Sequence, residues 1–162
     1  MTPLLFALAF AAEPSVVTPS PVRAVVSATP FVLDVPYRSD WRADRPEVRA
    51  GTLLLLDVDP AALVVRDGPS PVLYVGASPA EVVARDIPAG RVTVVVPGAL
   101  GPDVFAYFAA GDRLPDRVTP EEGARTLADA TAAGVAPLRV PAAAAARVVR
   151  DIDALEALAT AK

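Results

Sequence analysis

Prolines divide this sequence into short apolar runs. The chain of 162 residues contains 18 prolines, and proline has no backbone N–H to donate, so it usually lies at the ends of strands. The runs between the prolines are rich in valine and leucine and have the length of β-strands. We therefore expect five or six strands, and the runs lie at residues 22–28, 31–37, 52–56, 72–75, 91–96 and 104–109.

The run at residues 52–56 is the most continuous of these segments. Thr52 is followed by four leucines with no polar residue between them. Strands that are covered on both faces have such uninterrupted apolar sequences, whereas half-exposed strands alternate. The sequence therefore predicts that this segment is a central strand, which ends at the charged turn beginning with Asp57.

A short helix is predicted directly after the run at residues 72–75. Ser78 and Glu81 have the spacing of a capping box, and Pro79 would occupy the first helical position. The sequence after Ser78 thus favours a short helix that ends at about Arg85.

Two further helices are predicted in the C-terminal part of the chain. Thr119 and Glu122 repeat the capping-box spacing, and Gly134 supplies a stop. Pro141 opens the last predicted helix, and an apolar stripe follows it. The stripe consists of Val148, Ile152, Leu155 and Ala159.

These elements predict one α+β domain over residues 22–162. Its sheet would be mostly antiparallel or mixed, with five to six strands and two C-terminal helices packed on it. The segment before it divides into two parts. Residues 1–11 have the pattern of a signal peptide, because the apolar run 4–10 precedes the small-x-small triplet ending at Ala11. Residues 12–21 are rich in proline and serine and read as a linker.

This pattern predicts an exported protein, either periplasmic or extracellular; a buried N-terminal element is the alternative reading of residues 4–10. No apolar run reaches the roughly 20 residues that a membrane-spanning helix needs. The formal net charge is −4, which argues against nucleic-acid binding driven by charge.

The residue types that are missing exclude much of enzyme chemistry. The sequence has no Cys, His, Asn or Gln, and its one Lys is Lys162. Disulfides, thiolate nucleophiles and Ser-His-Asp relays are therefore excluded. We expect no cofactor and no metal site.

Two pairs of aspartates follow apolar runs. Asp57 and Asp59 come directly after the 52–56 run, and Asp112 and Asp116 come after the 104–109 run. This arrangement resembles the DxDxT and GDxxxD motifs of haloacid-dehalogenase-like phosphatases, in which the motifs lie at the ends of neighbouring parallel strands.

The resemblance implies a Mg²⁺-dependent phosphoryl hydrolase. It would make Asp57 the nucleophile, Asp59 the general acid/base, and Asp112 and Asp116 the carboxylates beside the metal. Ser78 would then be the phosphate-binding residue. The sequence departs from the family pattern at Pro60 and Ala61, which stand in the positions of Gly and Thr.

A charged loop at residues 37–49 is the candidate binding element. It contains the single Trp of the chain, Trp41, together with Arg38, Arg42 and Arg45. Trp and Arg are enriched at the centres of protein interfaces, so a protein partner of this loop is one hypothesis. The alternative is a solvated loop whose opposite charges pair with one another.

The sequence favours a non-catalytic binding or interaction module over an enzyme. A phosphoryl-transfer site needs a positioned cation beside the metal, and this chain lacks the lysine that would supply it. The phosphatase centred on Asp57 and Asp59 is the alternative hypothesis.

Overall fold

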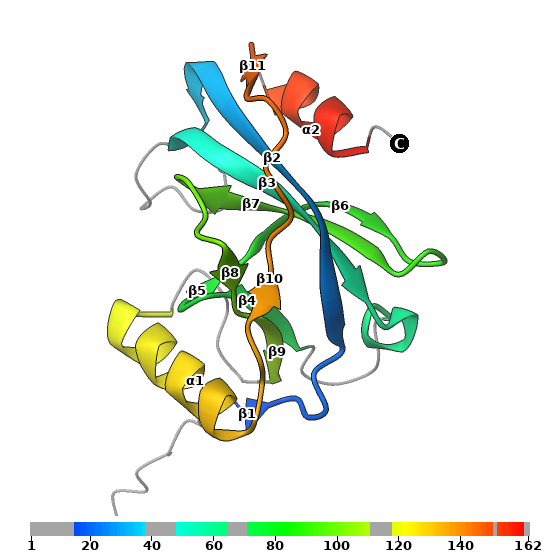
Figure 1. The fold of residues 1–162 in the computed structure, drawn as a ribbon, viewed down its shortest axis with the longest axis vertical. Helices are drawn as coiled ribbons and strands as arrows, with labels where there is room; N and C mark the ends of the chain where they lie inside the picture. The colour runs from blue at the N-terminus through cyan, green and yellow to red at the C-terminus, as the bar shows by residue number, and fades with distance from the viewer. Residues whose placement is uncertain (1–14, 38–47, 65–70, 111–117, 151, 161–162) are drawn as a thin grey trace, which may run out of the picture.

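The computed structural model describes residues 15–37, 48–64, 71–110, 118–150 and 152–160 (Figure 1). These residues are mostly sheet, and they include two short α-helices. The strands form three sheets, of five, four and two strands. The predicted α+β domain, with a single sheet of five to six strands and two C-terminal helices packed on it, is therefore wrong.

The five-stranded sheet has the strand order β11-β2-β3-β7-β6. Its neighbours are antiparallel except for the edge pair β11 and β2, which is parallel. The strands are β2 (Val22–Tyr37), β3 (Val48–Val58), β6 (Glu81–Asp86), β7 (Arg91–Pro97) and β11 (Arg147–Val149).

Strand β2 joins two runs that were predicted as separate strands. It continues through Pro30, whose ladder partner on β3 is Thr52. On its other side, β2 begins to pair with β11 only at Phe31. Proline is tolerated in a strand where one side is unpaired, because no ladder hydrogen bond is lost there.

The other two sheets are smaller. The four-stranded sheet has the order β1-β9-β4-β5 and is antiparallel throughout. It consists of β1 (Ser15–Val16), β9 (Ala106–Ala110), β4 (Val72–Val75) and β5 (Ser78–Pro79), so part of the Pro- and Ser-rich segment pairs with β9. The third sheet is the antiparallel pair β8 (Asp103–Val104) and β10 (Leu138–Arg139).

The two larger sheets pack face to face, and each carries one helix on its outer side. Between the sheets lie buried side chains of both, among them Leu54, Leu56, Val94, Leu73 and Phe108. Helix α1 (Pro120–Ala132) covers the four-stranded sheet through Ala130, which packs with Tyr74 and Tyr107. Helix α2 (Ile152–Thr160) covers the five-stranded sheet through Leu155, which packs with Phe31 and Leu53.

Strand β3 is central in its sheet, as the 52–56 run predicted. Leu53 is buried on the α2 side of the sheet, and Leu54 is buried between the sheets. Because successive side chains point to opposite faces, both faces of β3 are apolar and the alternation is lost.

Helix α1 is also confirmed. Thr119 accepts a hydrogen bond from the backbone N–H of Glu122, and the Glu122 carboxylate accepts one from the N–H of Thr119. Gly134 ends the helix with a φ of 86°, and the N–H of Val135 donates to the carbonyl of Ala130. This is the Schellman arrangement that the glycine predicted.

The helix predicted from Ser78 to Arg85 is wrong, because this segment forms β5 and β6. Gly76, with a φ of 60°, turns the chain between β4 and β5. Val82 then pairs with Val94 of β7. The β-branched residues after Pro79 favour this pairing over a helix.

The helix predicted from Pro141 also starts later than expected. Residues 141–146 have no regular structure, and β11 and α2 follow. Val148, which was assigned to the apolar stripe, has 73% of its surface exposed. It lies beside Val32 in the ladder between β11 and β2.

Candidate functional site

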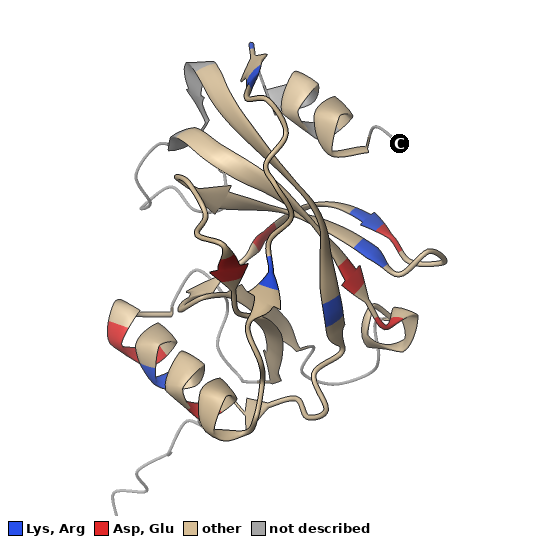
Figure 2. Cartoon of the chain, in the orientation of Figure 1, with Lys and Arg blue, Asp and Glu red and all other residues tan. Residues whose placement is uncertain are grey.

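Charged residues gather at one end of the five-stranded sheet (Figure 2). At this end β3 finishes and β7 begins, so that Asp57 and Arg91 are direct ladder partners. Asp86 of β6 is the ladder partner of Arg91 on the other side. The two aspartates that resemble a phosphatase motif therefore lie in a region where both signs of charge alternate.

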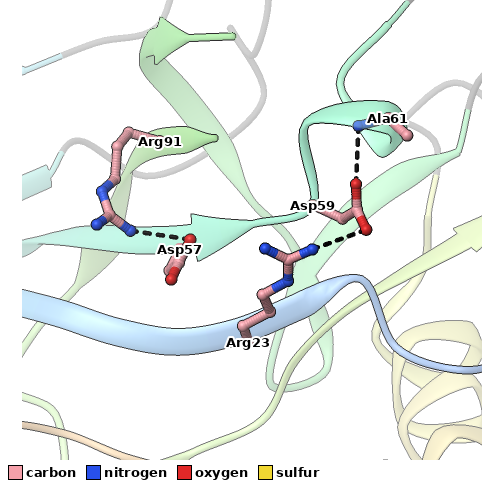
Figure 3. Close-up of polar contacts among 5 residues, drawn as sticks. All are labelled: Arg23, Asp57, Asp59, Ala61 and Arg91. Carbon is pink, nitrogen blue, oxygen red and sulfur yellow. Dashed lines mark hydrogen bonds and ion pairs between the residues drawn. The ribbon is translucent and has the colours of Figure 1, made fainter. Parts of the chain in front are cut away.

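The carboxylate of Asp57 forms an ion pair with an arginine on the neighbouring strand. Arg91 Nη1 lies 2.9 Å from Asp57 Oδ1 (Figure 3). The two side chains are 37% and 32% exposed, so water screens the pair only in part. Oppositely charged residues that face each other on neighbouring antiparallel strands commonly stabilise a sheet.

Asp59 caps the short 3₁₀ helix η2 (Pro60–Ala62) and forms an ion pair with a second arginine. One carboxylate oxygen, Oδ1, accepts a hydrogen bond of 2.9 Å from the N–H of Ala61, and Oδ2 accepts one of 2.8 Å from Arg23 Nη2 (Figure 3). The hydrogen bond from Ala61 is the main cause that lowers the pKa of Asp59; desolvation opposes it, and the charge and hydrogen bond of Arg23 lower the pKa further. Asp59 therefore has a full structural role as a helix cap.

The other residues of the phosphatase resemblance do not complete a site. Ser78 lies in β5 of the four-stranded sheet, which contacts α1 and lies away from η2 (Figure 1). Asp112 and Asp116 lie outside the described residues. Strand β3 is antiparallel to both of its neighbours, so it lacks the adjacent parallel strand ends of that family. Within the described ranges, no three acidic side chains cluster as metal ligands would.

The ends of the candidate binding loop are strand, because Tyr37 of β2 pairs with Val48 of β3, and residues 38–47 lie outside the described residues. This applies to Trp41, Arg38, Arg42 and Arg45. The hypothesis of a protein partner for this loop remains a prediction from sequence.

The described residues contain an open groove of about 720 Å³. Its floor is the inner face of the five-stranded sheet, at the part of β2 and β3 nearest to β11. On this face of β3, Leu54 is fully buried, Thr52 is 3% exposed, and Ala50, nearest the start of the strand, is exposed. The groove is thus a continuation of the core beyond the area that other elements cover.

The floor is built from ladder partners that point to the same face. Pro30 and Val32 of β2 lie opposite Thr52 and Ala50 of β3, and all four line the groove. Alternate residues of a strand share a face, so this surface is set by the register. These side chains are small or apolar, except for the Thr52 hydroxyl, which donates to the carbonyl of Gly98.

Two irregular segments form the walls. Residues 98–102 follow β7, and residues 139–146 run past β2 and β3 on the way from β10 to β11 (Figure 1). Backbone hydrogen bonds tie both walls in place, since Gly98 donates to Ala50, Val140 to Pro102 and Ala144 to Ala28. A groove with fixed walls is largely formed before a ligand arrives.

Sequence reasoning missed this groove. Its walls consist mainly of alanine, glycine and proline, and these residues carry no chemical signal in a sequence. The alanine run at residues 142–146 after Pro141 is the one available signal, and its pattern predicts a helix instead.

Comparisons with protein-family models, curated proteins and solved structures found no match to this chain. In the part of the chain that the structure describes, neither helix has the length and apolar character needed to cross a membrane. The groove and the two aspartate–arginine pairs are therefore the features from which a function can be argued.

Proposed function

We propose that this protein is an exported, non-catalytic binding module and that the groove holds its ligand. The observation that carries the proposal is the groove itself. Its volume of about 720 Å³ lies within the range of roughly 300–1,000 Å³ that is usual for small-molecule sites. Such sites are mostly apolar and preformed, and both properties hold for this groove.

The two aspartates support a non-catalytic role. Asp57 and Asp59 each have an arginine partner within 2.9 Å. These contacts give each carboxylate a structural role, since Asp57 pairs with Arg91 across two strands and Asp59 also caps η2.

A neutral fluorescent dye tests the proposed function. We expect N-phenyl-1-naphthylamine to bind the protein saturably, with the rise in fluorescence that apolar sites cause. Val32→Phe should fill the groove and weaken binding by about tenfold or more, because a larger side chain displaces the ligand from a packed site.

Val26→Phe is the matched control. Val26 and Val32 are both on β2 and are 40% and 47% exposed, but Val26 is not part of the groove lining. Its substitution should change dye affinity by less than about twofold. Absence of saturable binding, or equal losses in both variants, would refute the proposal.

Export is supported by the apolar run at residues 4–10 and by the small-x-small triplet that ends at Ala11. We predict that N-terminal sequencing of the protein made in a secreting host shows a chain that begins near Ala12. Recovery of chains with an intact Met1 from the cytosolic fraction alone would contradict export.

A further inference from the structure

We infer that the groove binds a linear alkyl chain that ends in a carboxylate, and that Arg139 holds the carboxylate. The inference rests on the proposed function and names the class of ligand. It starts from the distribution of charge, because Arg139 is the one charged residue among the described residues that line the groove. Residues 140–146 of the wall are all uncharged and are drawn tan in Figure 2.

The position of Arg139 gives the groove two different ends. Arg139 lies in β10, where the wall segment 139–146 begins, and the segment reaches Ala146 just before β11. The seven steps from Arg139 to Ala146 span at most about 25 Å in a fully extended chain. A ligand along this wall therefore needs an anionic group at one end and a long uncharged body.

Arg139 retains hydrogen-bonding capacity for such a group. Its partner Asp103 lies 3.8 Å away, which is longer than a hydrogen bond, and the two side chains are 81% and 47% exposed. Exposed ion pairs of this kind contribute little. A guanidinium group has five N–H donors and binds a carboxylate through two parallel hydrogen bonds.

The backbone of the groove favours an alkyl chain over a peptide. The floor strands β2 and β3 are already paired with each other at Pro30 and Val32. The N–H groups of Gly98, Val140 and Ala144 in the walls are also bonded. A peptide laid in the groove would gain no hydrogen bond from these groups, which are already bonded, whereas an alkyl chain needs none.

Calorimetric titrations with decanoate and decan-1-ol at pH 7.5 separate the two parts of this inference. We expect decanoate to bind about threefold to fivefold more tightly than the alcohol, because the exposed Arg139 guanidinium can bind the carboxylate through two parallel hydrogen bonds. Octanoate should bind about tenfold more weakly than decanoate, since two fewer methylenes are buried.

Three variants test the role of Arg139. Arg139→Gln should lose most of the preference for decanoate and leave decan-1-ol affinity within about twofold. Asp103→Asn removes the competing carboxylate and should strengthen decanoate binding by about threefold. Arg147→Gln is the matched control. It changes the net charge by the same amount, but Arg147 is not part of the groove lining.

The outcomes distinguish this inference from the proposed function. If decanoate and decan-1-ol bind equally well and Arg139→Gln changes neither, the carboxylate site is refuted and the groove stands. If neither alkyl ligand binds while the neutral dye does, the alkyl class is refuted. If Arg147→Gln alone abolishes decanoate binding, the assignment to Arg139 is wrong. If neither alkyl ligands nor dye bind saturably, both proposals fail.

Discussion

Asp59 shows how a single residue can look catalytic in sequence and be structural in the fold. We predict that its pKa, measured by NMR titration of the side-chain carboxyl carbon, lies below the ordinary value of 3.8. The main cause is the hydrogen bond from the Ala61 N–H, and the charge of Arg23 adds to it. A group whose pKa is lowered by folding stabilises the protein above its unfolded pKa, so this contribution is lost as the pH falls through the folded value.

Arg23→Gln is the control for this titration. It should raise the pKa of Asp59 only in part, because the Ala61 hydrogen bond remains. A pKa at or above 3.8 in the unmodified protein would contradict the capping role.

The sequence placed Asp57 and Asp59 correctly at the end of a strand, but it could not identify Arg23 and Arg91 as their partners. Those contacts depend on strand register, which joins residues 36 positions apart in the case of Arg23 and Asp59.

The start of α1 tests the folding account at the scale of one element. Thr119→Ala removes the hydroxyl that accepts the Glu122 N–H, and we expect it to lower the free energy of unfolding by about 1 kcal/mol. Thr131→Ala is the control, because that hydroxyl bonds only to the carbonyl of Leu127 within the same helix. Urea denaturation measures both variants. If Thr131→Ala lowered the free energy of unfolding more than Thr119→Ala, the capping account would be contradicted.

The elements that could be predicted are those set by local signals. The capping box at Thr119 and the leucines of β3 each determine their own structure. The same box spacing at Ser78 predicted a helix wrongly, because pairing of β6 with β7 overrides a cap. The last helix was misplaced for a related reason: residues 147–149 add to the edge of β2, which lies more than 100 positions earlier in the chain.

At the scale of the whole molecule, the groove follows from how the layers overlap. The sequence indicates which strands are apolar, but not which of their faces meet another layer. Ala50 and Val32 are exposed and lie outside the core between the sheets, because the described part of the neighbouring layer does not cover them. This property depends on the packing of whole sheets, so short motifs carry no trace of it.

The most direct test of the central claim is an NMR map of dye binding. Titration of the ¹⁵N-labelled protein with N-phenyl-1-naphthylamine should shift the backbone amide signals of Val32, Ala50, Ala99 and Ala142, which line the groove. Amides of α1, such as Leu127 and Ala130, should stay unchanged, because they pack on the far side of the four-stranded sheet. Shifts concentrated on α1, or no saturable shifts at all, would contradict the assignment of the groove as the binding site.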